Sequence, residues 1–427
     1  MRAHDLTGKR VVIWGTGMEG RAAAAFIHDR AAPSSLVFVD DAQGEEKGKA
    51  LAQADVLIKS PGVSLYRPEI HALLATKTPV TSLLNLWLAE PHTATVVGIT
   101  GSKGKSTTAA LLAHVLRENN GKRIALAGNI GTPVTAIDLN EIDIAIIEIS
   151  SYQAATLNEG CDIGVVTALY PEHLDWHGHV TRYYADKLNL LKQSRVTIAS
   201  PQVVEAAQAC GLDLTPSQLF AEAQGFHAQG TRLYDGEKPL PALDNGYLTR
   251  AHNLANVCAV LSVLRALGQD ISAALEAMKS FQGLPHRQQE LGEKDGLLYV
   301  NDSLSTTPHA SIAAMEAYAG RPLTLIAGGF DRGIDYAPLV DYVLRRPNTA
   351  IVCMGPSGER ILKALEESDA KTIALAASME EAIAFARAHT NVGGVVLLSP
   401  AAPSYGLFKD YAERGSCFAK ASGVTEG

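Results

Sequence analysis

Short apolar runs alternate along the chain with longer stretches in which apolar residues recur every three or four positions. The short runs are rich in Val, Ile and Leu and have the length of buried strands, whereas the longer stretches have the period of helices. The alternation occurs in three successive segments, and strands that alternate with helices are typical of parallel sheets covered by helices. The pattern therefore predicts an α/β protein of three domains, each built on a mainly parallel sheet.

The first segment, residues 1–93, opens with a predicted strand at 10–14, the turn "GTGMEG" and an alanine-rich helix. A second apolar run ends at Asp40, twenty positions after the last glycine of the turn. This spacing is that of a dinucleotide-binding loop, in which glycines let the backbone approach a diphosphate. A tight turn that binds nothing uses the same small residues. The segment therefore indicates a Rossmann-like domain, with or without a phosphorylated ligand.

The second segment, residues 94–283, begins with the glycine-rich loop "GITGSKGKSTT" between an apolar strand and a predicted helix. Its spacing differs from the common P-loop, because Gly98 lies six residues before Gly104. It still supplies backbone N–H groups, a lysine and a hydroxyl, which suit phosphates and Mg²⁺. We predict a P-loop domain that binds ATP through Gly101, Ser102, Lys103, Gly104, Lys105, Ser106 and Thr107.

Two further polar residues follow apolar runs of this segment. Glu148 ends the run "IAIIE", and His173 follows "IGVVTALYPE". A buried carboxylate needs a partner, for which Mg²⁺ is suitable, while His173 could be a ligand, a helix cap or a core residue. The carboxyl ends of parallel strands open on one edge of a sheet, so both are expected near the phosphate loop. Lys187, within a predicted helix, gives no signal by itself.

The third segment, residues 284–427, carries polar clusters directly after its predicted strands. The strands are expected at 298–300, 323–327, 350–353 and 395–398, and the clusters are "NDS", "GGFDRG" and "SPAAPS". Such clusters are typical of one side of a ligand-binding cleft in a second Rossmann-like domain. Before this segment, Asn253 and Asn256 lie on one face of a predicted helix, where their amides could read a purine or cap the helix.

Composition narrows the class of protein. The 427 residues are 47% hydrophobic and 19% charged, as in soluble globular proteins, and the net charge of −8 provides no basic field for nucleic acid. The five cysteines are scattered without a CxxC pair, which favours a reducing compartment. We find neither a signal-peptide pattern nor an apolar run of ~20 residues. We expect a cytoplasmic monomer that neither binds nucleic acid nor inserts into a membrane.

Eight motifs, taken in order, resemble those of the Mur ligase family, the ATP-dependent amino-acid ligases of peptidoglycan synthesis. They are "GITGSKGKSTT", "GNIGTP", "EISSYQ", "HLD", "HNLAN", "GLPHR", "NDS" and "LSP", and they extend over essentially the whole chain. Within the family the resemblance is greatest to the branch that adds glutamate to UDP-N-acetylmuramoyl-L-alanine. The small-molecule substrates implied are this UDP-linked acceptor, glutamate and ATP.

The resemblance implies a role for each matching residue. The first domain would bind the UDP substrate, and the third would bind glutamate. Lys105, His173 and Lys187 would be catalytic, Lys187 as a carbamylated lysine. The UDP substrate would contact Gly17, Met18, Asp40 and Asn129. Mg²⁺, expected as two ions, would be held by Ser106, Glu148, His173 and the carbamate of Lys187. Asn256 would face adenine, Arg287 the ribose and Asp302 the ATP, and glutamate would meet Arg332, Ser404 and Phe408.

The nucleotide turn departs from the family pattern at Glu19, where a small or hydroxyl residue is usual. A carboxylate close to a diphosphate is unfavourable. We therefore expect Glu19 to point away from the ligand or to bind Arg21.

Two other departures lie around the expected glutamate pocket. Leu304 stands where lysine is common, and "SPAAPSYG" replaces the usual segment, with Pro403 and with Gly406 in place of an acidic residue. The commoner members of this branch add D-glutamate, but members that add L-glutamate look similar at these positions. The local pattern therefore favours L-glutamate.

Three other functions compete with this interpretation. A sister ligase could add another amino acid, such as L-alanine, or resemble folylpolyglutamate synthase, but the "GLPHR" and "NDS" forms count against both. A P-loop ATPase that forms no bond would not explain the nucleotide-type first domain or the polar clusters of the third. An NAD-dependent dehydrogenase built on the first turn would leave the second phosphate loop without a role.

Overall fold

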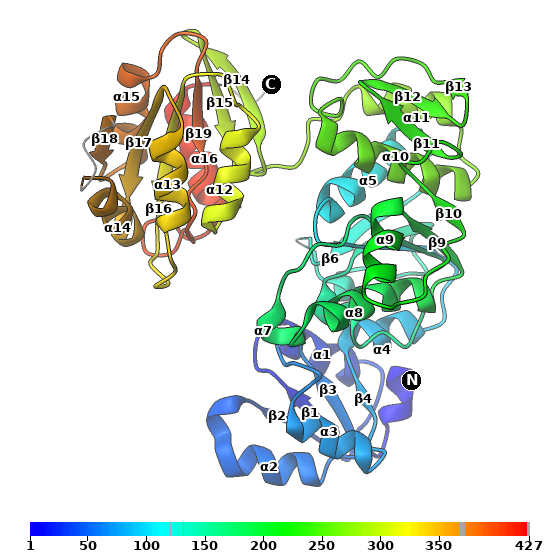
Figure 1. Ribbon diagram of the computed structural model, residues 1–427. Coiled ribbons are helices and arrows are strands. Elements are labelled where there is room, and N and C mark those ends of the chain that lie inside the picture. The colour runs from blue at the N-terminus through cyan, green and yellow to red at the C-terminus, as the bar shows by residue number, and fades with distance from the viewer. Residues whose placement is uncertain (120, 131, 367–371, 425–427) are drawn as a thin grey trace. The chain divides into compact units, whose positions relative to one another are not determined.

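The computed structural model describes residues 1–119, 121–130, 132–366 and 372–424 (Figure 1). The chain forms two compact units, residues 1–281 and 282–427. Both are α/β structures with mostly parallel sheets, which confirms the predicted fold class. The first unit contains two separate parallel sheets, and the boundary near residue 93 stays a prediction.

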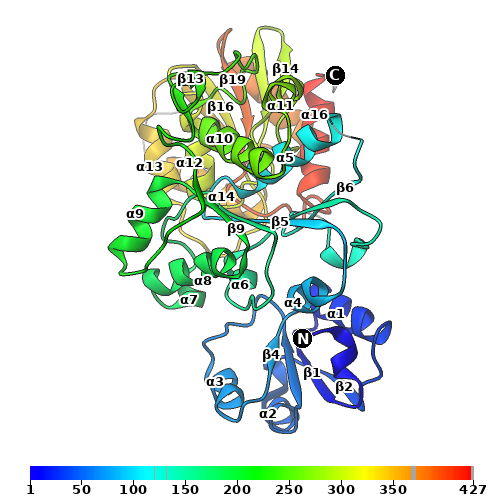
Figure 2. The same cartoon turned by 90° about the vertical axis from the view of Figure 1, so that its right-hand side faces the viewer.

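The first sheet, blue in Figure 2, has the strand order β2-β1-β3-β4 with all pairs parallel. Its central strand is buried from Val11 to Trp14, because helices cover both faces and the strand can be apolar throughout. The elements are η1 (Ala3–Leu6), β1 (Arg10–Trp14), α1 (Met18–His28), β2 (Ser35–Val39), η2 (Asp41–Gln43), α2 (Gly44–Ala52), β3 (Val56–Lys59), α3 (Pro68–Ala75), β4 (Val80–Thr81) and α4 (Leu83–Ala89).

The second sheet has the parallel order β10-β9-β8-β5-β7-β6, with β5 and the phosphate loop near its middle. Helix α5 follows that loop and packs against α10 and α11. The elements are β5 (Thr95–Thr100), α5 (Lys105–Asn119), β6 (Ile124–Gly128), η3 (Val134–Ala136), β7 (Ile144–Glu148), α6 (Ser151–Ala154), β8 (Ile163–Val166), α7 (Leu174–His177), α8 (Val180–Gln193), β9 (Val196–Ala199), α9 (Pro201–Ala209), β10 (Gln218–Leu219), α10 (Ala251–Ala266) and α11 (Ile271–Met278).

A small antiparallel sheet in the first unit was not predicted from the sequence. It consists of β11 (Phe226–Gln229), β12 (Arg232–Asp235) and β13 (Lys238–Pro239). Gly230, at φ +61°, lies in the tight turn between β11 and β12. These strands are short and largely polar, so they lack the apolar runs on which the prediction depended.

The second unit contains one sheet in the order β14-β15-β19-β16-β17-β18, parallel except for the edge strand β14. The four predicted strands are present, but the edge strands β14 and β18 were missed, because β14 is largely polar, β18 is short and both are partly exposed. The elements are β14 (Gln289–Lys294), β15 (Leu297–Asn301), α12 (Pro308–Glu316), β16 (Leu323–Gly328), α13 (Ala337–Arg345), β17 (Thr349–Met354), α14 (Gly355–Glu366), β18 (Thr372–Leu375), α15 (Met379–His389), β19 (Val395–Leu398) and α16 (Tyr411–Ser422).

A helix that crosses a bilayer needs about 20 mostly apolar residues. Within the described ranges, no helix is long and apolar enough to cross a membrane.

The turn from β1 into α1 depends on a residue without a side chain at position 20. A Cβ placed on Gly20 would overlap the carbonyl oxygen of Gly15, so the start of α1 can lie against the end of β1 only because this atom is missing. Gly48, in the exposed part of α2, has open space around it instead.

We expect Gly20→Ala to destabilise the protein by about 1–3 kcal/mol, because the new methyl group forces the backbone of the turn to move. Gly48→Ala is the matched control, and it should stabilise by about 0.5–1 kcal/mol because alanine is the better helix former. Thermal unfolding of both variants measures the difference. Equal melting temperatures would contradict the close approach.

Candidate active site

The phosphate loop lies between β5 and α5 and depends on two glycines with left-handed backbones. Gly101 has φ +145° and Gly104 has φ +85°. A Cβ on Gly101 would overlap the Thr167 hydroxyl, and one on Gly104 would overlap the side-chain oxygen of Asn256. The loop delivers the N-terminus of α5 to the carboxyl edge of the sheet, where free N–H groups and the helix dipole favour an anion.

Two lysine side chains converge on one carbonyl oxygen of this loop. Lys105 Nζ and Lys187 Nζ each donate to the Gly101 carbonyl at 2.8 Å. Lys187, from α8, is only 2% exposed. Burial, followed by repulsion from Lys105, lowers the pKa of Lys187 well below its usual range, while Glu172 and Glu148 act in the opposite direction. The structure thus places Lys187 at the loop, which its position in the sequence alone did not indicate.

Glu148, the last residue of β7, carries a buried oxygen available to a cation. Its Oε1 accepts a hydrogen bond from Asn129 Nδ2 at 2.9 Å. Its Oε2 is buried and has no hydrogen-bond partner among the described residues. Such an oxygen is costly unless a donor or a cation approaches it, and Mg²⁺ prefers oxygen ligands. The residues present therefore fit a magnesium ion at this edge.

Side chains of the described residues do not form a complete metal-binding site by themselves. In the part of the chain that the structure describes, no three His, Cys, Asp or Glu side chains gather closely enough to bind a metal. Mg²⁺ usually keeps waters and takes only one or two carboxylates together with substrate phosphates. The arrangement suits an ion that arrives with a nucleotide.

His173 precedes α7 with an unusual left-handed backbone, φ +54° and ψ +37°. Its side chain makes no capping bond to α7, which rules out one of the two structural alternatives raised by the sequence. Instead its Nδ1 lies 3.0 Å from the hydroxyl of Tyr152, at an exposed position that excludes a core residue as well. Burial is the main cause that lowers the pKa of His173 and so favours its neutral form. A neutral imidazole is the form that binds metals.

A cavity of about 620 Å³ brings these groups together in the first unit. Its wall combines residues at the phosphate-loop edge of the second sheet with residues of the first segment, including Pro61, which follows β3. Five of the residues predicted for catalysis or for the UDP substrate line it, namely Met18, Lys105, Asn129, His173 and Lys187. Ser151, Tyr152 and Gln153 also line the cavity and were not singled out from the sequence.

The remaining residues predicted to bind UDP lie at the turn after β1. Gly17 is the N-cap of α1. Asp40 follows β2 beside the same turn, where Thr16 Oγ1 donates to its Oδ2 at 3.3 Å. Glu19 does not need Arg21, which donates to the Thr16 carbonyl at 2.7 Å. Glu19 is held by Lys59 and Gln153 instead, although burial raises its pKa overall.

Asn256 of α10 lies against the phosphate loop. Its Oδ1 accepts from Thr108 Oγ1 at 3.3 Å, and its Nδ2 donates to Asn253 Oδ1 at 3.2 Å. Asn253 donates in turn to the carbonyl of Tyr247 at 2.9 Å. Neither amide is the N-cap of α10, a position that Arg250 occupies. The structure therefore favours a place beside the phosphate loop over the capping alternative.

In the second unit, Asp302 is a buried carboxyl at the end of β15. Burial raises its pKa to about 6, opposed by hydrogen bonds that include Ser399 Oγ at 2.7 Å and the backbone N–H of Gln288 at 3.1 Å. The charge of Arg287 also lowers this pKa. Arg287 and Asp302 are thus neighbours, as the roles predicted for them require.

The residues predicted for glutamate come from two loops of this unit that touch each other. Phe330 N–H donates to the Pro403 carbonyl at 2.9 Å, and Phe408 N–H donates to the Ser404 carbonyl at 3.0 Å. Arg332 Nη2 donates to the Thr306 carbonyl at 2.9 Å. The loops after β15, β16 and β19 are therefore adjacent, as expected for parallel strands.

Arg414 of α16 connects the loops after β15 and β19 by hydrogen bonds, and it was not predicted from the sequence. Its guanidinium donates to the Ser303 hydroxyl at 3.0 Å, the Ser303 carbonyl at 2.8 Å and the Ala402 carbonyl at 3.0 Å. Burial lowers its pKa to about 10. Nothing in "YAERGSCFAK" distinguishes this arginine from one on a solvated helix face, so the sequence contains no signal that would have found it.

Comparison with known proteins identifies the family. Residues 99–209 match the model of the Mur ligase middle domain, and residues 286–402 match that of the Mur ligase glutamate ligase domain. A relative from Salinispora tropica, named UDP-N-acetylmuramoyl-L-alanine--L-glutamate ligase, is 40% identical over 100% of both chains. The chain belongs to the Mur ligase family. It is an ATP-dependent amide-bond-forming ligase, and Mur ligases in general use ATP and Mg²⁺.

Other Mur ligases agree with this identification. A protein of the same name from Xanthomonas axonopodis pv. citri is 41% identical over 99% of this chain and 97% of its own. Among solved structures, the UDP-N-acetylmuramate-alanine ligase of Thermotoga maritima is similar with a TM-score of 0.57, 16% identity and coverage of 96% and 98%. The MurF ligase of Thermotoga maritima, in complex with ADP, gives a TM-score of 0.54, 17% identity and coverage of 99% and 96%. These two structures show the shared fold.

The buried amine of Lys187 makes the stability of this Mur ligase depend on pH. Because the folded-state pKa is lowered, the unfolded chain binds more protons between that value and the usual one, so stability rises with pH in this window. Lys187→Met removes the effect, and the Gly101 carbonyl keeps Lys105 as a donor. We expect the variant to melt above the wild type at pH 7, with a margin that shrinks toward pH 10.

The measurement is thermal unfolding of the ligand-free protein in CO₂-free buffer at both pH values. Lys192→Met, at an exposed position of α8, is the control and should show no such margin. A margin for Lys187→Met that stays constant or grows with pH would contradict the assignment.

Proposed function

We propose that this Mur ligase joins glutamate to UDP-N-acetylmuramoyl-L-alanine through an acyl-phosphate intermediate. The observation that carries the proposal is the cavity whose wall contains Lys105 of the phosphate loop, Lys187 of α8 and Met18, the first residue of the helix that follows β1. An acceptor held by the first sheet would extend along this cavity toward a nucleotide on the phosphate loop. The names of the relatives from Salinispora tropica and Xanthomonas axonopodis support the same substrates.

The reaction needs ATP because a carboxylate is a poor electrophile. Transfer of the γ-phosphoryl group to the alanine carboxylate forms an acyl phosphate and ADP. The amine of glutamate attacks its carbonyl carbon, and the tetrahedral intermediate collapses as phosphate leaves and the nitrogen loses a proton. Negative charge develops on oxygen atoms throughout, so cations and backbone dipoles stabilise the transition states.

The phosphate loop supplies much of this stabilisation. In the proposal Gly101, Ser102, Lys103, Gly104 and Thr107 surround the ATP phosphates with N–H groups, while Lys105 leaves the Gly101 carbonyl for a phosphate oxygen. Ser106, Glu148 and His173 would hold Mg²⁺, which would neutralise phosphate charge. The buried unpartnered oxygen of Glu148 supports its part in this set.

Lys187 joins the metal ligands as a carbamate. An unprotonated amine attacks CO₂, a nitrogen–carbon bond forms and a proton leaves, so the side chain changes from a cation into an anion with two oxygens. The lowered pKa of Lys187 supports this step because it increases the fraction of unprotonated amine. A second Mg²⁺ beside the carbamate would complete the charge balance of the site.

The three segments divide the substrates among them. Residues 1–93 bind the UDP group through Gly17, Met18 and Asp40, while Asn129 of the next segment meets the sugar. Residues 94–283 bind ATP, with adenine at Asn256. Residues 284–427 bind the ribose at Arg287, the ATP at Asp302, and glutamate at Arg332, Ser404 and Phe408. The adjacency of Arg287 and Asp302 supports the nucleotide part of this division.

We propose L-glutamate as the amino acid. The departures at Leu304, Pro403 and Gly406 fall around the glutamate loops, and relatives that match the whole chain are named as L-glutamate ligases.

The test is phosphate release from the purified protein with ATP, Mg²⁺ and UDP-N-acetylmuramoyl-L-alanine, with either L-glutamate or D-glutamate. We expect release with L-glutamate and little with D-glutamate. Release with D-glutamate alone would reverse the stereochemistry. Release without the UDP substrate would indicate an ATPase, and no release with either enantiomer would favour a sister ligase.

Lys187→Ala tests the carbamate. Loss of the anionic ligand should abolish most ligation, and short carboxylic acids such as acetate should restore part of it by occupying the vacated space. Lys192→Ala, on the same helix, should keep full activity and show no response to acetate. Unchanged activity of Lys187→Ala would remove the assignment, and loss without rescue would leave only a structural role.

A further inference from the structure

Glu19, the second residue of α1, lines the substrate cavity, and none of the roles proposed above uses it. A small or hydroxyl residue is usual at this position in the family pattern, so we expected Glu19 to point away from the ligand or to bind Arg21. The structure places Glu19 in the cavity wall instead, while Arg21 donates to the Thr16 carbonyl. A ligand in the cavity therefore meets this carboxylate.

The side chain of Gln153 forms a hydrogen bond with Glu19. Gln153 Oε1 accepts from the backbone N–H of Ser150 at 3.0 Å and from Ser150 Oγ at 3.1 Å. These two bonds fix the orientation of the amide, and its nitrogen is the group that can donate to Glu19. The contact joins the start of α1 to α6, and Glu19 and Gln153 both line the cavity.

Lys59, the last residue of β3, supplies a positive charge to the same carboxylate. Lys59 is only 2% exposed, and burial lowers its pKa to about 8 against the attraction of Glu19. An ion pair that buries a charge contributes little to stability compared with apolar residues of similar size. Stability by itself therefore does not account for the pair, whereas a fixed hydrogen-bond acceptor at a cavity wall does.

The position of Glu19 in the cavity wall indicates which part of the substrate it meets. In the proposed reaction the UDP group contacts Gly17 and Met18, which directly precede Glu19. The alanine carboxylate approaches Lys105 and Lys187, which line the same cavity. The amino sugar joins these two parts of the substrate, so it lies between them and next to Glu19.

The chemistry of a carboxylate also selects the sugar. A carboxylate accepts hydrogen bonds and repels other anions. The phosphates and the alanine carboxylate of the acceptor substrate are anions without a hydrogen to donate. The N-acetylated sugar between them carries hydroxyl groups and an acetamido N–H, all of which can donate.

We propose that Glu19 is a specificity-determining residue that accepts a hydrogen bond from the amino sugar of the acceptor substrate. The inference rests on the proposed function and deepens it. Lys59 and Gln153 hold the carboxylate at the wall, and the sugar supplies the remaining donor. Glu19 thereby favours a UDP-linked sugar over UDP alone.

Calorimetric titration without ATP tests this preference, with UDP and UDP-N-acetylmuramoyl-L-alanine as ligands. In Glu19→Ala we expect the sugar nucleotide to bind at least about tenfold more weakly, because a hydrogen bond to a charged acceptor is lost. UDP should bind as tightly as in the wild type or more tightly, because a repulsive charge is removed. An unchanged Kd for the sugar nucleotide, or equal weakening of both ligands, would overturn the proposal.

A double variant separates the contact from a defect in folding. Glu19→Ala leaves the buried Lys59 without this carboxylate, whereas Glu19→Ala combined with Lys59→Met removes both charges. We expect the double variant to show the same loss for the sugar nucleotide, with thermal unfolding as the check of its fold. Recovery of the wild-type affinity would mean that the unpaired lysine caused the loss, and the proposal would be wrong. Glu46→Ala, at an exposed position of α2, is the matched control and should change neither Kd.

Two further comparisons identify the donor. UDP-N-acetylglucosamine and UDP-2-deoxyglucose differ at C2, so a loss in Glu19→Ala with both assigns the donor to a hydroxyl, and a loss with the first alone assigns it to the acetamido N–H. A loss with neither would contradict the sugar contact. Titration of UDP with and without Mg²⁺ excludes a metal bridge: weakening of UDP in Glu19→Ala only when Mg²⁺ is present would place a cation at Glu19 and reject the proposal.

The titrations also separate this proposal from the ligase proposal. A wild-type protein that binds none of these UDP compounds would reject the proposed acceptor substrate and the role of Glu19 with it. A protein that binds them and ligates glutamate, but is unaffected by Glu19→Ala, would reject the role of Glu19 alone.

Discussion

The geometry of the active site follows from two lysine side chains that share the carbonyl oxygen of Gly101. Burial lowers the pKa of Lys187, the more deeply buried of the two, and repulsion from Lys105 lowers it further. A phosphate on the loop would compete with that carbonyl for Lys105 and would relieve the repulsion. The same contact places Lys187, from a distant helix, beside the phosphate loop. The loop glycines, the end of β7 with Glu148 and the cavity are arranged around this point.

The sequence was sufficient to predict the fold class and the sheet edge at which residues at the ends of apolar strands lie. Glu148 and the phosphate loop are examples, because the carboxyl ends of parallel strands meet at one edge whatever the details of packing. Polar strands such as β14 and very short strands such as β13 could not be found by the same reasoning, since their formation depends on neighbours and not on their own pattern. Lys187 was located only through the family resemblance, because a helix period cannot tell a buried lysine from an exposed one.

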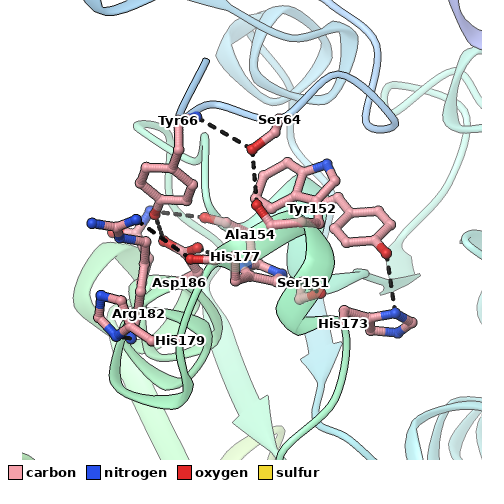
Figure 3. A network of polar contacts seen from close by, with 12 residues as sticks. Ser64, Tyr66, Ser151, Tyr152, Ala154, His173, His177, His179, Arg182 and Asp186 are labelled. Carbon is pink, nitrogen blue, oxygen red and sulfur yellow. Dashed lines mark hydrogen bonds and ion pairs between the residues drawn. The ribbon is translucent and has the colours of Figure 1, made fainter. Parts of the chain in front are cut away.

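Tertiary contacts supplied what the sequence could not. Arg414 fastens two loops that lie about a hundred residues apart in the chain, and its partners are mostly backbone carbonyls, which leave no trace in residue identity. The hydrogen-bonded network of Tyr66, Asp186, His177 and Ser151 likewise joins residues from separate elements (Figure 3). Contacts of this kind hold loops and helices in place around the cavity.

The unpartnered oxygen of Glu148 also bears on how long the protein survives between catalytic cycles. A buried carboxylate oxygen without a hydrogen-bond partner lowers the stability of the ligand-free fold. Any ligand that binds only the folded chain stabilises it by mass action, by about 2.7 kcal/mol at a hundred times the dissociation constant. Proteases act mainly on transiently opened chains, and the population of these chains falls as the folded state is stabilised. A ligand that binds only the folded chain would therefore also protect it from proteolysis.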